Sequence, residues 1–158
     1  MAVCLVNLRP VAFVTAVFTV ACFVLSGLTV FAQPDVSASC AALMVAETGE
    51  LIYGKNEHDR RSMASTTKIM TSLLAIEALT PQRKITVSAD MLNVEGTSMG
   101  LLPGDTVTLE GLVYGMLLQS GNDAANVTAI TLGGNVENFV SMMNKRAGEI
   151  GMNDTHFE

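Results

Sequence analysis

The segment at residues 62–77, Ser-Met-Ala-Ser-Thr-Thr-Lys-Ile-Met-Thr-Ser-Leu-Leu-Ala-Ile-Glu, constrains the fold of this chain more than any other. An apolar stripe at helical spacing predicts an amphipathic helix from Ser65 on, with Ile69, Leu73 and Ile76 on one face. Ser65 and Lys68 lie three residues apart in the first turn, so their side chains are neighbours. A first turn normally favours Asp or Glu, and a capping box would place Glu or Gln where Lys68 stands. A cation that breaks this stability rule indicates a functional site.

The N-terminal segment predicts export. Residues 11–31 are uncharged and apolar, Arg9 precedes them, and Val30-Phe-Ala32 offers small residues at the positions that a signal peptidase reads. Residues 1–32 are therefore predicted to be a secretory signal peptide, which places the remaining chain outside the cytoplasmic membrane, in the cell envelope. An uncleaved membrane anchor is the alternative, because the apolar run approaches the length of a bilayer crossing.

Composition after residue 32 excludes several classes of function. Cys40 is the single cysteine there, so no internal disulfide is expected, and its apolar neighbours predict a buried strand position. Arg9 is one of nine basic residues, which leaves eight against fifteen acidic ones without any extended basic cluster. Nucleic-acid binding therefore has no electrostatic basis. His58 and His156 stand far apart without other ligands at metal-binding spacing, so we expect neither a metal nor a cofactor.

The rest of the patterning predicts a β-hairpin followed by four helices. The hairpin joins residues 41–46 to 51–53 through a turn at Gly49. The helices are expected at about 65–79, at 109–119 after an N-cap at Thr108, at about 123–132, and from Asn135 to Ile150 with a buried stripe of Phe139, Val140, Met143, Ala147 and Ile150. A short strand is expected at 85–87, and residues 88–105 read as irregular. Two or three strands are too few to cover these helices, so residues 33–158 are expected to be the N-terminal part of a larger α+β domain.

Two short motifs suggest nucleophilic catalysis. A serine becomes a nucleophile when a base takes its proton, and a lysine serves as that base if its surroundings hold it neutral. Ser65 and Lys68 supply both groups. Ser120-Gly-Asn122 follows between two predicted helices, where a hydroxyl can relay a proton and an amide can hold the lysine and a substrate. The alternative is a helix stop at Gly121 with Asn122 or Asp123 capping the next helix.

With these motifs in this order, the chain resembles the N-terminal part of a serine-type D-alanyl-D-alanine carboxypeptidase, a low-molecular-mass penicillin-binding protein. The resemblance covers about residues 38–158 and is most specific in residues 63–71, 118–126 and 151–157. It implies a β-lactamase/transpeptidase-like α+β fold, with the N-terminal β-hairpin and most of the helical subdomain present and the later sheet strands lacking.

The resemblance also implies a reaction in cell-wall peptidoglycan biosynthesis, the removal of the terminal D-Ala from stem peptides through an acyl-serine intermediate. Ser65 would attack the substrate carbonyl, Lys68 would accept its proton, Ser120 would pass a proton to the departing D-Ala, and Asn122 would bind the substrate. β-Lactams would acylate Ser65 as covalent inhibitors. An uncleaved signal or a C-terminal anchor would attach the protein to the membrane.

One part of the family pattern does not occur in this sequence. The Lys-Thr-Gly motif, which in the family lies on a strand beside the second oxyanion donor, is not found among the 158 residues. Because one oxyanion donor is worth about 10²–10³ in rate, we expect the 158-residue chain alone neither to turn over D-Ala-D-Ala peptides nor to label with a fluorescent penicillin. A class A β-lactamase, which usually has Asp where Gly121 stands, and a non-catalytic β-lactam sensor are the alternatives.

Overall fold

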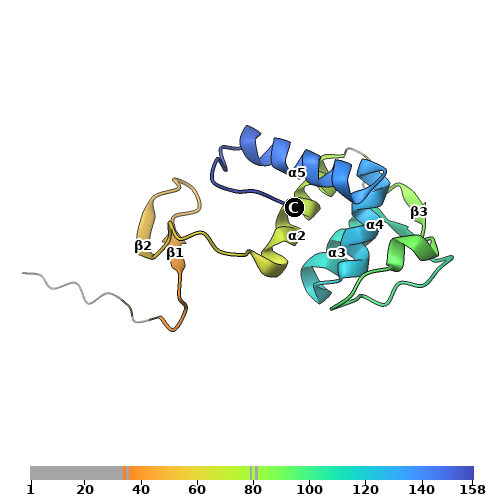
Figure 1. Cartoon of the computed structure of the whole chain (residues 1–158), viewed down its shortest axis with the longest axis horizontal. Coiled ribbons are helices and arrows are strands. Elements are labelled where there is room, and N and C mark those ends of the chain that lie inside the picture. The colour runs from red at the N-terminus through yellow and green to blue at the C-terminus, as the bar shows by residue number, and fades with distance from the viewer. Residues whose placement is uncertain (1–33, 35, 79, 81) are drawn as a thin grey trace, which may run out of the picture. The chain divides into compact units, whose positions relative to one another are not determined.

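The structure is a computed structural model that describes residue 34, residues 36–78, residue 80 and residues 82–158 (Figure 1). The predicted signal peptide lies outside the described residues. The chain divides into two compact units, one ending at Arg60 and one running from Arg61 to Glu158. No helix within the described part is long and apolar enough to cross a membrane.

The first unit contains the predicted β-hairpin. Strand β1 (Ala41–Met44) pairs antiparallel with β2 (Leu51–Lys55), and Gly49 takes a positive φ of 72° in the connecting turn. Such a φ suits glycine because other residues would place a Cβ against the backbone. The buried strand position predicted for Cys40 is wrong: Cys40 is half-buried and directly precedes β1. Within the described residues, the sheet of this unit has two strands, and every residue in them is exposed or half-buried.

The second unit contains the four predicted helices. They are α2 (Thr67–Glu77), α3 (Leu109–Gln119), α4 (Asn122–Gly133) and α5 (Val136–Glu149). Helix α2 packs against α3 and α4, α3 against α4, and α4 against α5 (Figure 1). A 3-10 turn, η1 (Ala64–Thr66), precedes α2, and a second one, η2 (Ala89–Leu92), lies in the region predicted to be irregular.

A pair of short strands completes the second unit. The predicted strand is β3 (Lys84–Thr86), and it pairs antiparallel with β4 (Thr106–Thr108), with Ile85 opposite Val107. The sequence does not predict strand β4, because three residues carry little strand signal without their partner. The predicted cap at Thr108 is confirmed, since its Oγ1 accepts a hydrogen bond from the N–H of Gly111 at 3.0 Å.

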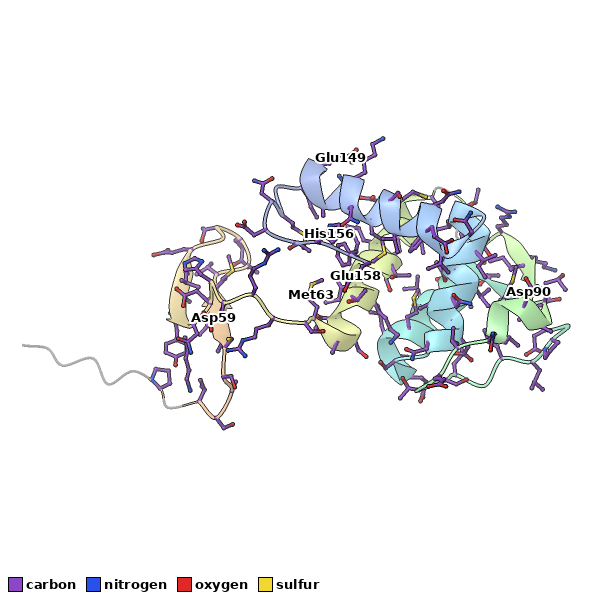
Figure 2. The ribbon with its side chains drawn as sticks, in the orientation of Figure 1. Asp59, Met63, Asp90, Glu149, His156 and Glu158 are labelled. Atoms are coloured by element: carbon purple, nitrogen blue, oxygen red, sulfur yellow. The ribbon has the colours of Figure 1, made fainter. Side chains whose placement is uncertain are left out.

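Two apolar clusters form the core of the second unit. One lies where α3 and α4 meet β3 and includes Leu109, Leu112, Val127, Ile85 and Val87. The other lies between α2, α4 and α5 and consists of Met70, Ala129, Phe139, Met143, Ala147 and Phe157. The predicted stripe of α5 is confirmed at Phe139, Met143 and Ala147, whereas Val140 is half-buried and Ile150 is exposed as the C-cap. Figure 2 shows Glu149 on the outer end of α5 and Asp90 on η2, both exposed.

The buried face predicted for α2 is wrong. Ile69 and Ile76 are 63% and 60% exposed and Leu73 is half-buried, whereas the buried residues of α2 are Lys68, Met70, Thr71, Ser72 and Ala75. Hydropathy favours the isoleucine face, but Thr71, Ser72 and Ala75 on the buried face are small side chains that allow the neighbouring helices to approach. This orientation also carries Lys68 inward, toward α4.

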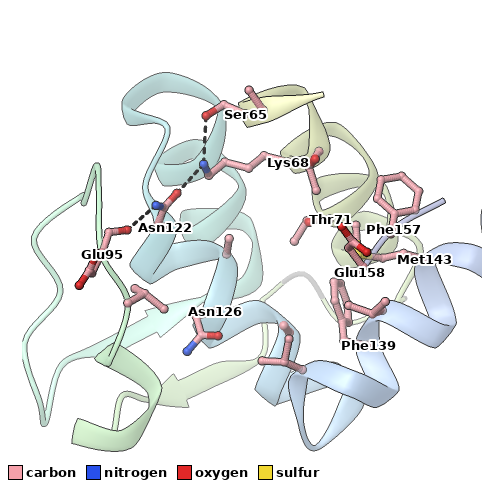
Figure 3. Close-up of a pocket in the computed structure, with 17 residues that line it drawn as sticks. Ser65, Lys68, Thr71, Glu95, Asn122, Asn126, Phe139, Met143, Phe157 and Glu158 are labelled. Atoms are coloured by element: carbon pink, nitrogen blue, oxygen red, sulfur yellow. Dashed lines mark hydrogen bonds between the residues drawn. The ribbon is translucent and has the colours of Figure 1, made fainter. Parts of the chain in front are cut away.

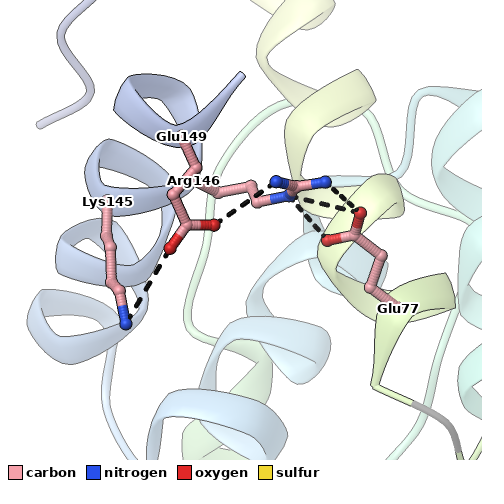
Figure 4. A network of polar contacts seen from close by, with 4 residues as sticks. All are labelled: Glu77, Lys145, Arg146 and Glu149. Atoms are coloured by element: carbon pink, nitrogen blue, oxygen red, sulfur yellow. Dashed lines mark hydrogen bonds and ion pairs between the residues drawn. The ribbon is translucent and has the colours of Figure 1, made fainter. Parts of the chain in front are cut away.

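Ion pairs join the far end of α2 to α5. Arg146 donates two nearly parallel hydrogen bonds to Glu77, from Nη2 at 2.7 Å and from Nε at 2.9 Å, and it also pairs with Glu149 at 3.3 Å (Figure 4). A two-pronged arginine–carboxylate contact fixes geometry as well as distance. The network therefore helps to hold α5 against α2, the helix that carries Lys68.

Candidate active site

Ser65 and Lys68 meet where η1 passes into α2. Side chains at i and i+3 nearly eclipse in a 3-10 turn, and Lys68 Nζ lies 3.4 Å from Ser65 Oγ. Ala64, immediately before the serine, has a φ of 45°, in the left-handed region that non-glycine residues rarely adopt. Ser65 is exposed, whereas Lys68 is only 8% exposed. The nucleophile candidate therefore faces the solvent while the candidate base lies beneath it.

Ser120 is more than 50 residues away from Ser65 and Lys68 in the sequence, but its side chain lies beside theirs. It is the C-cap of α3 and adopts a left-handed conformation, with φ 55° and ψ 34°. Its Oγ lies 2.9 Å from Ser65 Oγ and 3.3 Å from Lys68 Nζ. A left-handed residue other than glycine costs about 1–2 kcal/mol, and such strain is concentrated at functional sites.

This strain predicts a difference between two variants that both lack the hydroxyl. Ser120→Gly is expected to be more stable to unfolding than Ser120→Ala by about 1 kcal/mol, because glycine adopts the left-handed conformation without a Cβ clash. Chemical denaturation of both variants measures the difference. An alanine variant as stable as the glycine variant would show that Ser120 is not strained.

Asn122 is the first residue of α4, and its side-chain amide is held at both ends. Its Oδ1 accepts a hydrogen bond from Lys68 Nζ at 2.7 Å, and its Nδ2 donates to the carbonyl oxygen of Glu95 at 2.5 Å (Figure 3). Lys68 Nζ thus has three acceptors, two hydroxyls and an amide oxygen, none of which carries a charge. The structure brings all four predicted site residues together, and their catalytic roles stay predictions.

A cavity of about 610 Å³ opens beside these side chains, between α2, α4 and α5. Its polar end is formed by Ser65, Lys68, Asn122 and Glu95, and its floor is apolar and includes Phe139, Met143 and Phe157 (Figure 3). A concave apolar site with a few convergent polar groups is the usual form of a small-ligand site. Among the described residues, no group of His, Cys, Asp and Glu side chains is arranged to hold a metal ion.

Asp123 is the residue at this site that sequence reasoning underestimated. The alternative in which Asn122 or Asp123 caps the next helix is wrong, because the N-cap is Gly121 and both residues lie in the first turn of α4. The carboxylate of Asp123 is buried and accepts a hydrogen bond from the Ser98 hydroxyl at 2.6 Å and from three N–H groups of residues 99–101. The only signal in the sequence is an acidic residue directly after the Ser120-Gly-Asn122 motif, and an earlier irregular segment that contains Gly96 and Gly100.

The hydrogen bonds of Asp123 predict a loss of stability in acid. Burial alone would raise its pKa, but hydrogen bonds from Ser98 and from the N–H groups of Met99, Leu101 and Ala124 outweigh burial and lower the pKa to about 2. A lowered folded-state pKa contributes stability that is complete above the unfolded pKa near 4 and is lost as the pH falls through about 2. From pH 5 to pH 2, the stability advantage of the parent chain over Asp123→Asn is expected to shrink by at most about 2 kcal/mol. Denaturant titrations across this range measure it, and a difference that does not change with pH would contradict the assignment.

Together, an exposed serine, a buried lysine and a Ser-x-Asn turn on one helical unit form the arrangement that the resemblance to penicillin-binding proteins predicts. A family model described as D-alanyl-D-alanine carboxypeptidase matches residues 28–158, and this chain belongs to that family. This confirms the resemblance and the β-lactamase/transpeptidase-like α+β fold predicted from the sequence.

Individual relatives agree with the family match. The chain is 37% identical over 126 residues to the D-alanyl-D-alanine carboxypeptidase DacF of Bacillus subtilis, covering 77% of this chain and 32% of that protein. It is 35% identical over 136 residues to DacD of Escherichia coli, covering 79% of this chain and 35% of that protein. The chain thus spans about a third of the length of these curated relatives.

Solved structures show the same fold. The DacD structure from Francisella tularensis superposes with a TM-score of 0.75 at 37% identity, covering 80% of this chain and 32% of that one. The D-alanyl-D-alanine carboxypeptidase from Mycobacterium tuberculosis superposes with a TM-score of 0.77 at 28% identity, covering 82% and 49%.

Proposed function

We propose that this chain carries the nucleophile, the base and the proton relay of a serine-type D-Ala-D-Ala carboxypeptidase, which removes the terminal D-Ala from peptidoglycan stem peptides. The observation that supports this most strongly is the position of Lys68 Nζ, within 3.4 Å of Ser65 Oγ and 3.3 Å of Ser120 Oγ. One amine that reaches both hydroxyls can take a proton from one and return it through the other.

The first half of the reaction forms an acyl-enzyme. Ser65 Oγ attacks the carbonyl carbon of the penultimate D-Ala and transfers its proton to Lys68 Nζ. The backbone N–H of Ser65 donates a hydrogen bond to the oxyanion of the tetrahedral intermediate. When the intermediate collapses, the peptide bond breaks, and Ser120 Oγ protonates the amine of the departing D-Ala while it receives a proton from Lys68.

The second half releases the shortened peptide. A water molecule attacks the ester carbonyl of acylated Ser65, and its proton passes to the same lysine, which returns a proton to Ser65 Oγ as the ester bond breaks. A β-lactam enters the first half in the same way, because its strained amide takes the place of the D-Ala-D-Ala bond. We place this reaction on the outer side of the cytoplasmic membrane, where the predicted signal peptide would deliver the chain.

The alternatives make different products. A class A β-lactamase would release hydrolysed penicillin quickly and no D-Ala, and a β-lactam sensor would keep the acyl group without acting on peptides. Gly121 stands where class A enzymes usually have Asp, and the family match is to carboxypeptidases, so both observations favour the carboxypeptidase.

The test uses the 158-residue chain and a chimera in which Glu158 is followed by the segment that comes after the matched region in Escherichia coli DacD. A folded chimera is expected to release D-Ala from a peptide ending in D-Ala-D-Ala, and Ser65→Ala is expected to abolish this release. The 158-residue chain, which contains no Lys-Thr-Gly, is expected to release none. Rapid penicillin hydrolysis without D-Ala release would favour the β-lactamase instead, and stable labelling without either activity would favour the sensor.

A further inference from the structure

An irregular segment, residues 95–101, runs beside Ser120 and the start of α4 and forms hydrogen bonds with Ser120 and with Asn122. The carbonyl oxygen of Thr97 accepts a hydrogen bond from the N–H of Asn122 at 2.7 Å, and Thr97 Oγ1 donates to the carbonyl oxygen of Ser120 at 2.5 Å. The carbonyl oxygen of Glu95 accepts from Asn122 Nδ2. Asn122 is thus held by this segment through both its main chain and its side chain.

The other half of the segment is anchored on a single carboxylate. Asp123 Oδ1 accepts from the N–H of Met99 at 3.0 Å, and Oδ2 accepts from the N–H groups of Gly100 at 3.1 Å and Leu101 at 3.0 Å. The hydroxyl of Ser98 donates to Oδ2 as well, at 2.6 Å. Four consecutive residues therefore bind one side chain, which is only 4% exposed. Hydrogen bonds to a buried charged acceptor are stronger than neutral ones.

The contact between the segment and the motif is tight. A Cβ placed on Gly96 would lie 2.6 Å from Asn122 Nδ2, and a Cβ on Gly121 would lie 2.8 Å from Asp123 Oδ1 and 3.1 Å from the N of Met99. Glycine at these two positions allows residues 95–101 and the start of α4 to approach each other this closely. Because the segment approaches Asn122 so closely and is hydrogen-bonded to it, we expect a shift of the segment to move the Asn122 amide.

We infer that Asp123 is a positioning residue for the acyl-transfer site: its carboxylate anchors residues 95–101, and the Glu95 carbonyl of that segment orients the Asn122 amide toward Lys68. A side-chain amide can present either its oxygen or its NH₂ group to a neighbour. As long as Nδ2 donates to Glu95, Oδ1 is left to face Lys68 Nζ, at 2.7 Å. When the segment is released, the amide is free to rotate and its NH₂ group offers the lysine no acceptor.

The orientation of Asn122 can be tested in the full 158-residue chain without any enzymatic activity. Asp123→Asn keeps the volume of the side chain but replaces one acceptor oxygen by a donor. Val127→Ala is the matched control, since Val127 is fully buried one turn further along α4 and its truncation destabilises the same helix without removing a hydrogen bond of the segment. The readout is the NMR resonance of the Asn122 side-chain NH₂ group and the hydrogen exchange of the N–H groups of residues 99–101.

We expect Asp123→Asn to shift the Asn122 NH₂ resonance and to speed exchange at residues 99–101 by at least about tenfold, while Val127→Ala leaves the resonance in place. An unshifted resonance in Asp123→Asn, or an equal shift in Val127→Ala, would overturn the inference. Ser98→Ala removes a single hydrogen bond to the carboxylate and is expected to give a smaller shift in the same direction. If Asp123→Asn does not fold, Ser98→Ala becomes the deciding variant. An unshifted Asn122 NH₂ resonance in Ser98→Ala would then contradict the proposed role of Asp123.

The consequence for catalysis rests on the proposed function. In the chimera with Escherichia coli DacD, Asp123→Asn is expected to slow acylation by up to about 10²-fold, because catalytic groups displaced by about 1 Å lose that much rate. Val127→Ala is expected to acylate at the parent rate wherever it is folded. If the parent chimera is not acylated at all, the proposed function fails while the NMR result still decides the role of Asp123. If both variants acylate at the parent rate, the inference fails and the proposed function stands.

Discussion

Replacing Lys68 by methionine is expected to slow the acylation of Ser65 by about 10³-fold, since the variant has no group to take the serine proton. The side chain of methionine has nearly the same length as that of lysine, so the variant keeps most of the packing around position 68. The Ser120–Ser65 hydrogen bond, at 2.9 Å, does not depend on the lysine. Acylation of the chimera by a fluorescent penicillin gives the rate, and a denaturant titration gives the stability.

The matched control for this prediction is Lys145→Met. Lys145 is an exposed lysine on α5 that pairs only weakly with Glu149, at 3.9 Å (Figure 4). We expect it to acylate at the parent rate. A folded Lys68→Met variant that acylates within about tenfold of the parent would remove Lys68 from the mechanism, because a positioned general base is worth about 10²–10⁴ in rate.

Phe139→Ala is expected to have the largest effect on stability, a loss of about 3–5 kcal/mol. Phe139 is 2% exposed and packs with Met70, Met143 and Phe157, where it forms part of the cavity floor. For a unit of this size the loss corresponds to a fall in Tm of more than about 10 °C. Calorimetry of the 158-residue chain measures this fall.

Two variants test whether packing is the cause. Phe139→Leu keeps most of the apolar volume and is expected to lose about 1 kcal/mol. Ile76→Ala removes an equally apolar residue that is 60% exposed, and it is expected to change stability by no more than about 0.5 kcal/mol. If Ile76→Ala proved as costly as Phe139→Ala, the assignment of the buried and exposed faces of these helices would be wrong.

The local parts of the site were predictable from the sequence because they depend on spacing within one element. Ser65 and Lys68 are three residues apart at a helix start, so their contact follows from helix geometry alone. The turn at residues 120–122 was likewise indicated by Gly121 between two apolar patterns. Ser65 and Ser120 are 55 residues apart in the sequence. Only the resemblance to a family implied that their side chains meet.

The parts that were missed depend on partners distant in the sequence. Ile69 and Ile76 have the hydropathy of core residues, and only the packing of α2 on α3 and α4 shows that the opposite face is buried. Strand β4 exists because β3 pairs with it, about twenty residues earlier. The carboxylate of Asp123 accepts its hydrogen bonds from residues 98–101, and the conformation of this segment cannot be predicted because its sequence follows no repeating pattern.

Mass spectrometry of the penicillin-treated chimera tests the central claim, that Ser65 is the nucleophile, most directly. The account predicts a single adduct, one per chain, on the peptide that contains Ser65, and no adduct in the Ser65→Ala variant. Folding of both proteins is checked by their thermal unfolding. An adduct on Ser120 or on any other residue of the parent, or an adduct that persists in folded Ser65→Ala, would contradict the account.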